Sequence, residues 1–132
     1  MRRMTGTVDT SRRPLLRVVR PDGNPILSMI DTGFNGEVWI GKFDAIACGV
    51  DFDDVHESTG YVAGMRPIRE ASSNLRILWF GEERVVDVVI DIDSTHRTIG
   101  ASEPVTLIGT ALIEPATLTV SFARRRVRLT QL

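Results

Sequence analysis

Apolar residues fall mainly into runs of strand length, and few segments of the chain show the 3.6-residue period of a helix. Val86, Val88 and Ile90 illustrate the pattern, because alternate residues point to the same face of a strand. The runs predict strands over residues 14–20, 25–30, 37–40, 55–62, 75–80, 84–90, 105–108, 117–122 and 127–129. Short helices are predicted over residues 42–48 and 110–114. We therefore expect an all-β, barrel-like domain over residues 1–132, with one or two short helices.

Glycine and proline separate these runs. Residues 21–24, Pro-Asp-Gly-Asn, predict a tight turn, because proline fixes one φ angle and glycine and asparagine tolerate a positive one. A second turn is expected over residues 80–83, between two strands that pair. Gly49 ends the first helix and Pro115 the second, since proline cannot continue a helix.

The composition narrows the class of protein. Apolar residues make up 42% and charged residues 25% of the chain, which is ordinary for a globular protein and argues against disorder. The net charge of −1 creates no global field toward nucleic acid or anionic membranes, so neither is expected as a partner. The longest uncharged run, between Glu103 and Glu114, is about half as long as a membrane span. The charged start has no apolar stretch behind it, so we expect no secretory signal.

Cys48 is the only cysteine. One thiol cannot form an internal disulfide, and the sequence has no Cys/His spacing typical of zinc sites. We therefore expect a reducing compartment, the cytoplasm, with Cys48 as a small core residue.

The arginines are concentrated near the two ends of the chain. Residues 1–20 contain six arginines and one acid, and residues 124–128 contain four arginines. Residues 44–57 contain five acids and no basic residue. The simplest interpretation is that these clusters form solvated faces and turns. Two alternatives stay open: contact between basic and acidic segments of two chains, and nucleic-acid binding through the basic ends, which the net charge disfavours.

The segment with the clearest chemical potential is Asp31-Thr32-Gly33, which follows the apolar strand 26–30. The acid leaves a strand that we expect to be buried, so its carboxylate is expected to be partly desolvated. The threonine hydroxyl can bind nearby backbone, and the glycine permits a sharp turn whose N–H groups approach the acid. A polar turn without catalytic function would use the same three residues.

The sequence beyond this segment favours a catalytic loop over a polar turn. A second apolar run ends in glycine at residues 105–109, and a short helix and a hairpin follow it. With these features the sequence resembles the retropepsin-like aspartic proteases, particularly the small single-domain bacterial members. The resemblance rests on residues 5–9, 13–15, 31–36, 107–110 and 118–122. It implies a closed retropepsin-like β-barrel, the acid protease fold, in which two apolar segments cross in a ψ shape beneath the catalytic loop.

The resemblance also implies roles for individual residues. Asp31, Thr32 and Gly33 would form the catalytic loop, with the Thr32 hydroxyl bonded to the partner's loop. Leu107, Ile108 and Gly109 would form the ψ-shaped crossing. The terminal strands would build a dimer interface.

Aspartic proteolysis then constrains the assembly. It needs two carboxylates that share one proton, one acting as general base and the other as general acid. This chain has one Asp-Thr-Gly, because residues 93–95 lack the glycine and residues 58–60 lack the acid. We therefore expect a homodimeric endopeptidase that acts on a peptide or protein, with Asp31 from each subunit and no cofactor or metal. The alternative is a catalytically silent dimer of the same fold that binds peptide segments.

Substrate contacts are expected from two places. Phe34 and Asn35 follow the catalytic tripeptide, and Phe34 stands where viral members have a small residue, so viral specificity is not expected to apply. Ala63, Gly64 and Met65 are the candidate flap, because glycine there would let an extended peptide approach the backbone. A plain hairpin turn at these three residues is an equally good interpretation.

The remaining candidates have simpler explanations. His56 and His96 are isolated and are expected at the surface. Residues 91–96 begin like a calcium loop, but His96 stands where that loop requires glycine. Trp39 and Trp79 are expected to pack in the core.

Overall fold

Ten strands and two short helices make up the part of the chain that the computed structural model describes, namely residues 1–52, 56–62, 66–93 and 106–132. In chain order the elements are β1 (Arg2–Val8), β2 (Pro14–Val19), β3 (Pro25–Ile30), β4 (Val38–Gly41), α1 (Lys42–Ala47), β5 (His56–Val62), β6 (Arg66–Trp79), β7 (Glu82–Asp91), β8 (Thr106–Ile108), α2 (Thr110–Ile113), β9 (Thr117–Ser121) and β10 (Arg126–Gln131). The expected hairpin tip at Ala63, Gly64 and Met65 lies outside the described residues, as does His96. The all-β class with two short helices is confirmed.

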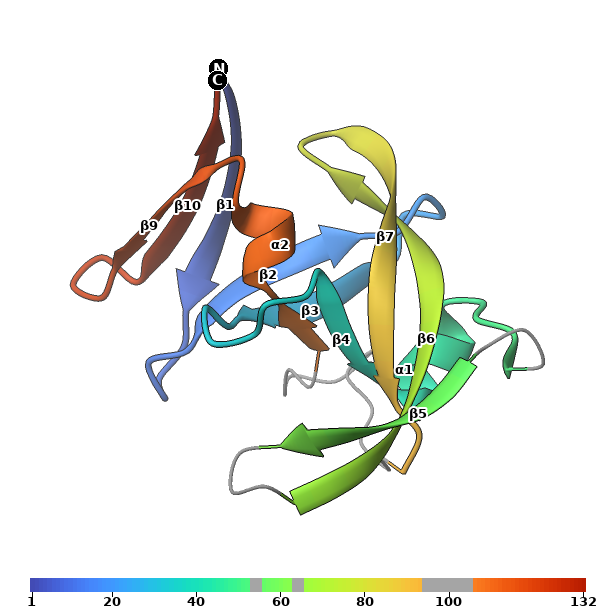
Figure 1. Cartoon of the computed structure of the whole chain (residues 1–132). Coiled ribbons are helices and arrows are strands. Elements are labelled where there is room, and N and C mark those ends of the chain that lie inside the picture. The colour runs from blue at the N-terminus through green and yellow to red at the C-terminus, as the bar shows by residue number, and fades with distance from the viewer. Residues whose placement is uncertain (53–55, 63–65, 94–105) are drawn as a thin grey trace.

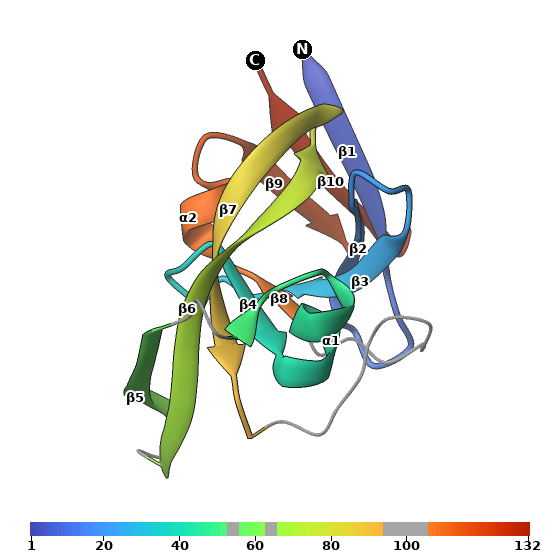
Figure 2. The same cartoon turned by 90° about the vertical axis from the view of Figure 1, so that its right-hand side faces the viewer.

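Six of the strands form a closed barrel (Figures 1 and 2). Their order is β6-β7-β4-β8-β3-β2, and β2 returns to β6 through the single pair Val19 and Leu78. β5 extends the sheet beyond β6 on one side. β1, β10 and β9 extend it beyond β2 on the other, and we call these three strands the terminal sheet.

Two strands differ from the sequence-based expectation. β1 was not predicted, because residues 2–8 are mostly polar or small and their pairing partners lie in β10 and β2. β6 starts at Arg66 rather than at residue 75, and its polar first half pairs with β5 outside the barrel. Both differences arise from pairing with remote segments, which local hydrophobic pattern does not reveal.

The turn between β6 and β7 has the geometry of a tight hairpin. Trp79 pairs with Glu82, so Phe80 and Gly81 form a two-residue loop with φ angles of 52° and 78°. Positive φ at both positions matches the twist of antiparallel strands. The turn predicted at 80–83 is therefore confirmed, with a non-glycine residue in the left-handed region.

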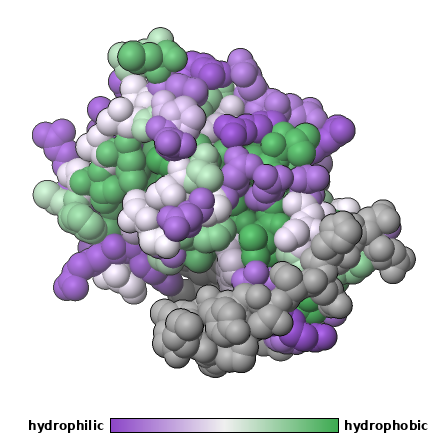
Figure 3. Space-filling model, viewed as in Figure 1, coloured by the Kyte–Doolittle hydropathy of each residue, from purple (hydrophilic) through white to green (hydrophobic). Residues whose placement is uncertain are grey.

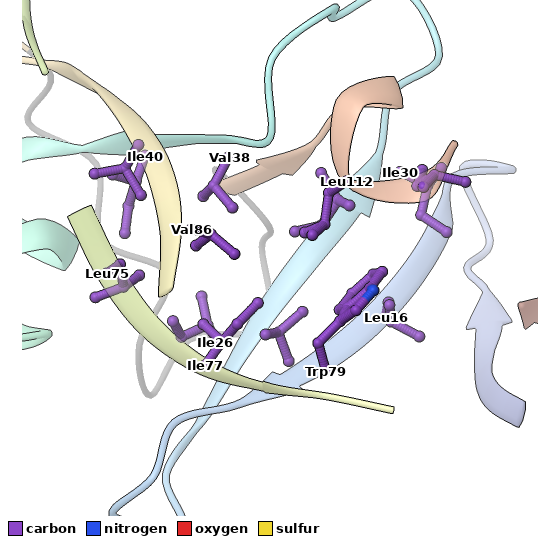
Figure 4. Close-up of a cluster of buried hydrophobic side chains, with 14 of the residues drawn as sticks. Leu16, Ile26, Ile30, Val38, Ile40, Leu75, Ile77, Trp79, Val86 and Leu112 are labelled. Carbon is purple, nitrogen blue, oxygen red and sulfur yellow. The ribbon is translucent and has the colours of Figure 1, made fainter. Parts of the chain in front are cut away.

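The barrel interior is filled by apolar side chains from most of its strands and from α2 (Figure 4). Val86, Val88 and Ile90 are at most 1% exposed, which confirms the predicted strand face. Trp79 is buried as expected, whereas Trp39 is only half-buried. Asp44 is also buried, within α1, although it belongs to a stretch that we expected to be a solvated face.

The terminal sheet has one face toward the core and one away from it. Met4, Leu129 and Leu118 form one row across β1, β10 and β9, and Val127 with Val120 continues the next row. Val127 and Leu129 are fully buried, and the other three pack against the core while partly exposed. Among the described residues, no helix is long and apolar enough to span a membrane.

Candidate active site

Asp31 lies at the carboxyl end of β3, where β3 meets β8. These two strands run parallel, with Ile30 beside Ile108, and β4 continues the sheet antiparallel to β8. The backbone N–H of Asp31 donates to the carbonyl of Ile108 at 2.9 Å, so this pairing extends one residue past the strand. The central strands of the barrel thereby fix the position of Asp31, whose side chain remains partly exposed.

The Asp31 carboxylate is oriented by its own loop. Gly33 N–H donates to Asp31 Oδ1 at 2.9 Å. A Cβ atom at position 33 would lie 3.2 Å from the same oxygen, closer than most real Cβ contacts. Glycine therefore lets the loop fold tightly over the acid while leaving the other carboxylate oxygen for water or substrate.

Residues 31–37, here called the Asp31 loop, are bonded to the start of α2. The carbonyl of Phe34 accepts from Thr110 N–H at 2.9 Å and from Thr110 Oγ1 at 3.2 Å. Ala111 N–H donates to the carbonyl of Gly36 at 3.2 Å, and Gly109 N–H donates to the carbonyl of Glu37 at 2.9 Å. α2 thus uses its unsatisfied N-terminal N–H groups to hold the loop.

The ring of Phe34 lies against two glycines. A Cβ at Gly36 would lie 2.5 Å from Phe34 Cζ, and one at Gly109 would lie 2.5 Å from Phe34 Cδ2. These two glycines therefore form a slot for the Phe34 ring, in which a Cβ atom at either position would overlap the ring. Phe34 was predicted as a substrate contact, and the structure places much of its ring against its own loop, with part of the residue exposed.

Glu37 anchors the far end of the Asp31 loop, and sequence reasoning did not find it. Its Oε2 accepts from Arg84 Nη2 at 2.9 Å, and its Oε1 accepts from the backbone N–H of Asp87 at 2.9 Å. Both partners lie in β7, which pairs in parallel with β4 directly after Glu37. No local signal marks this contact, because its partners lie about 50 residues away in the sequence.

A hollow of about 350 Å³ lies beside the loop. It is lined by Thr32, Asn35 and four residues of or next to α2: Thr110, Ala111, Ile113 and Glu114. Thr32 and Asn35 are exposed, so their polar groups are available to a ligand or to another chain. The structure thus brings together residues 31–35 and 107–109 of the predicted site. The candidate flap lies outside the described residues.

The Asp31 loop itself offers one carboxylate that is not engaged in an ion pair with any described residue. Asp31 is the partly exposed acid of the loop, and Glu37 is engaged by Arg84. Asp31 could hold a water molecule and accept its proton, but one carboxylate cannot also protonate a carbonyl oxygen. Within the described part of the chain, no group of three His, Cys, Asp or Glu side chains is placed to hold a metal ion.

Comparison with known proteins bears on the fold. No family model and no curated protein matches the chain. Its structure is similar to the crystal structure of a retropepsin-like aspartic protease from Rickettsia conorii, with a TM-score of 0.71 and 15% sequence identity. The match covers 98% of this chain and 90% of the Rickettsia chain. The chain therefore has the retropepsin-like fold, with a closed six-stranded barrel and two short helices.

Proposed function

We propose that the protein is a homodimeric aspartic endopeptidase whose active site contains Asp31 from each of two copies. The observation that carries this proposal is the Asp31 loop, in which an accessible carboxylate is held by Gly33 N–H and by the β3–β8 pairing. The fold shared with a retropepsin-like aspartic protease supports the same conclusion. A loop this firmly bonded is more than an isolated polar turn requires.

In the proposed mechanism a water molecule lies between the two Asp31 side chains. The ionised carboxylate accepts a proton from this water as its oxygen attacks the carbonyl carbon of the peptide bond. The protonated carboxyl of the second copy donates its proton to the carbonyl oxygen. Collapse of the resulting diol breaks the C–N bond. The leaving nitrogen takes the proton held by the first carboxylate, and one hydroxyl of the diol returns a proton to the second carboxylate. Two close carboxylates titrate as a pair, which keeps one of them protonated.

The terminal sheet supports dimerisation. β9 is the last strand of the sheet, so its outer backbone groups have no partner strand among the described residues. Figure 3 shows a hydrophobic patch, bordered by hydrophilic surface, on the side of the molecule where β9 and β10 lie in Figure 1. In this hairpin Leu118 and Val120 are half-buried, and Phe122 in the turn after β9 is 60% exposed. An apolar patch beside an open strand edge is typical of an association surface.

The hollow beside Thr32 is assigned to the same interface. By the resemblance described above, Thr32 of each copy would bond to the loop of the other. The hollow shared by Thr32, Asn35 and α2 would then receive part of the second copy. Substrate would lie across both Asp31 side chains, with the exposed part of Phe34 at its edge.

The test is cleavage of a diverse peptide pool from acid to neutral pH, at protein concentrations at which sedimentation shows a dimer. Wild type and Asp31→Asn are compared, with Asp87→Asn as an exposed acid on β7 for control. We expect cleavage by wild type and by Asp87→Asn, and none by Asp31→Asn. Peptide binding without cleavage by a dimeric wild type would support the alternative of a silent peptide-binding dimer. Equal cleavage by Asp31→Asn would refute the role of Asp31.

A further inference from the structure

The outer face of the terminal sheet is entirely polar and carries no acid. The register of β1, β10 and β9 places nine side chains on this face in three rows of three. The rows are Arg3, Thr130 and Thr117; Thr5, Arg128 and Thr119; and Thr7, Arg126 and Ser121. Alternation along each strand puts the apolar residues on the opposite face. The result is a surface of three guanidinium and six hydroxyl groups.

These guanidinium groups lack local counter-charges. Arg3, Arg126 and Arg128, together with Arg124 in the adjoining turn, form no ion pair with any described residue. Most surface arginines elsewhere do, as the pairs of Arg69 with Asp93 and of Arg76 with Glu83 illustrate. The net charge of −1 therefore conceals a positive face.

The face is also hollowed where the arginines gather. A depression of about 200 Å³ is lined by Thr119, Ser121, Arg124, Arg126 and Arg128. The Nε of Arg128 is buried and has no hydrogen-bond partner among the described residues. An unpaired buried donor is costly unless an acceptor completes it. A second hollow of about 270 Å³ lies beside β1 and is lined by Thr5, Gly6, Thr7, Leu15, Arg17 and Leu27.

We propose that this outer face binds the phosphodiester backbone of double-stranded nucleic acid, without reading its sequence. Arginine, serine and threonine side chains are common partners of phosphate oxygens in protein–DNA contacts. Arg126 and Arg128 are two residues apart on one strand, about 7 Å, which equals the axial rise of two nucleotide steps and so separates alternate phosphates of one nucleic-acid strand. The expectation against a nucleic-acid partner rested on the net charge, which does not describe this face.

The other anionic partners fit the face less well. Single-stranded nucleic acid is usually bound by aromatic side chains that stack on bases, and none of the nine residues is aromatic. A membrane-binding surface combines basic with apolar side chains, and none of the nine residues on this face is apolar. An acidic peptide that extends a sheet would use the edge of β9, whereas the guanidinium groups lie on the face. The proposal does not depend on peptidase activity.

The test measures binding of a fluorescent duplex DNA of about 25 base pairs at several salt concentrations. The face variant is Arg3→Gln, Arg124→Gln and Arg126→Gln, three exposed residues whose loss leaves the half-buried Arg128 intact. The control variant is Arg2→Gln, Arg69→Gln and Arg76→Gln, which removes the same charge from residues paired with Glu82, Asp93 and Glu83. Circular dichroism establishes that both variants are folded.

We expect micromolar binding by wild type at about 50 mM NaCl, with a log–log salt slope of about −3 to −4 for four phosphate contacts. The face variant should bind at least about tenfold more weakly, with a slope shallower by about 2 to 3 units. The control variant should lose less than about threefold. Absence of wild-type binding, or equal losses in the two variants, would overturn the proposal. So would binding to vesicles of anionic phospholipid or to polyglutamate at the same affinity as to DNA.

Discussion

The carboxylate of Glu37 and the guanidinium of Arg84 join the Asp31 loop to β7 by a 2.9 Å contact. The Glu37 side chain is only 17% exposed, so this pair is better shielded from water than the pairs of Arg69 with Asp93 and of Arg76 with Glu83. The second Glu37 oxygen accepts from Asp87 N–H, so the carboxylate is attached to β7 through both of its oxygens. Glu37 therefore anchors the loop that carries Asp31 to β7.

Replacing Glu37 by alanine should lower the free energy of unfolding by about 2 kcal/mol, because a partly buried charged acceptor of two hydrogen bonds is removed. Urea denaturation measures the change. Glu83→Ala is the matched control, since its pair with Arg76 is exposed and should contribute less than about 1 kcal/mol. Equal losses in the two variants would contradict the anchoring role of Glu37.

The slot that holds Phe34 can be tested with a double substitution. Gly36→Ala should destabilise the fold by about 1 to 3 kcal/mol, because the three atoms nearest to the new Cβ all belong to the Phe34 ring. Adding Phe34→Ala should relieve this clash, so the double variant should be more stable than the sum of the single effects predicts.

Gly109→Ala provides the control for this cycle. Its Cβ would also lie 2.7 Å from the backbone carbonyl of Phe34, which Phe34→Ala does not remove. Phe34→Ala should therefore not rescue Gly109→Ala. Additive effects of Gly36→Ala and Phe34→Ala would show that the ring does not occupy the slot in solution.

The proposed interface predicts a specific weakening of the dimer. Phe122→Ser should raise the dimer dissociation constant at least about tenfold, because a mostly exposed ring would be lost from the interface core. Val85→Ser removes another large apolar side chain that is 57% exposed, on β7, and should leave association unchanged. Analytical ultracentrifugation distinguishes the two, and equal effects would place the interface elsewhere.

Asp9 predicts a pH-dependent contribution to stability. The backbone N–H of Arg13, with its guanidinium and the N–H of Ser11, holds the pKa of Asp9 below its usual value. A folded pKa below the unfolded one stabilises the protein above about pH 4, and this contribution disappears as the pH falls through the folded pKa. Asp9→Asn should therefore be less stable than wild type at pH 7 and equally stable near pH 2. A difference that persists at pH 2 in urea titrations would exclude this origin.

Cys48 should be chemically inert in the folded protein. Burial raises its pKa to about 11, against the opposing effect of the nearby Arg20. Because the thiolate is the reactive form, iodoacetamide should label native Cys48 about 100-fold more slowly at pH 7.5 than the unfolded chain. Similar rates in native protein and in guanidinium chloride would contradict this.

Much of the barrel could be predicted because the alternation of apolar and polar residues within each strand is visible in the local sequence. Val86, Val88 and Ile90 show the period of a strand buried on one face. Residues 21–24 predict a turn, and Gly23 there has a φ of 89°. The Asp31 loop was found because an acid, a hydroxyl and a glycine directly follow an apolar run. These signals need only neighbouring residues, so sequence reasoning could find them.

The remaining features depend on pairings that cross the chain. β1 is a strand because Arg2–Val8 lies beside β10, more than a hundred residues later in the sequence. The role of Glu37 depends on Arg84 in the same way. The three-by-three arrangement on the terminal sheet is likewise visible only once the register of its strands is known.

Because the barrel closes through the single pair Val19 and Leu78, the strand pairing there should be less stable than the pairing elsewhere in the barrel. A seam with one residue pair has few hydrogen bonds to break, whereas the strands beneath Asp31 are paired on both sides. Local opening should therefore start between β2 and β6, with early exchange of amide hydrogens there. Local opening between β2 and β6 would then leave the geometry around Asp31 unchanged.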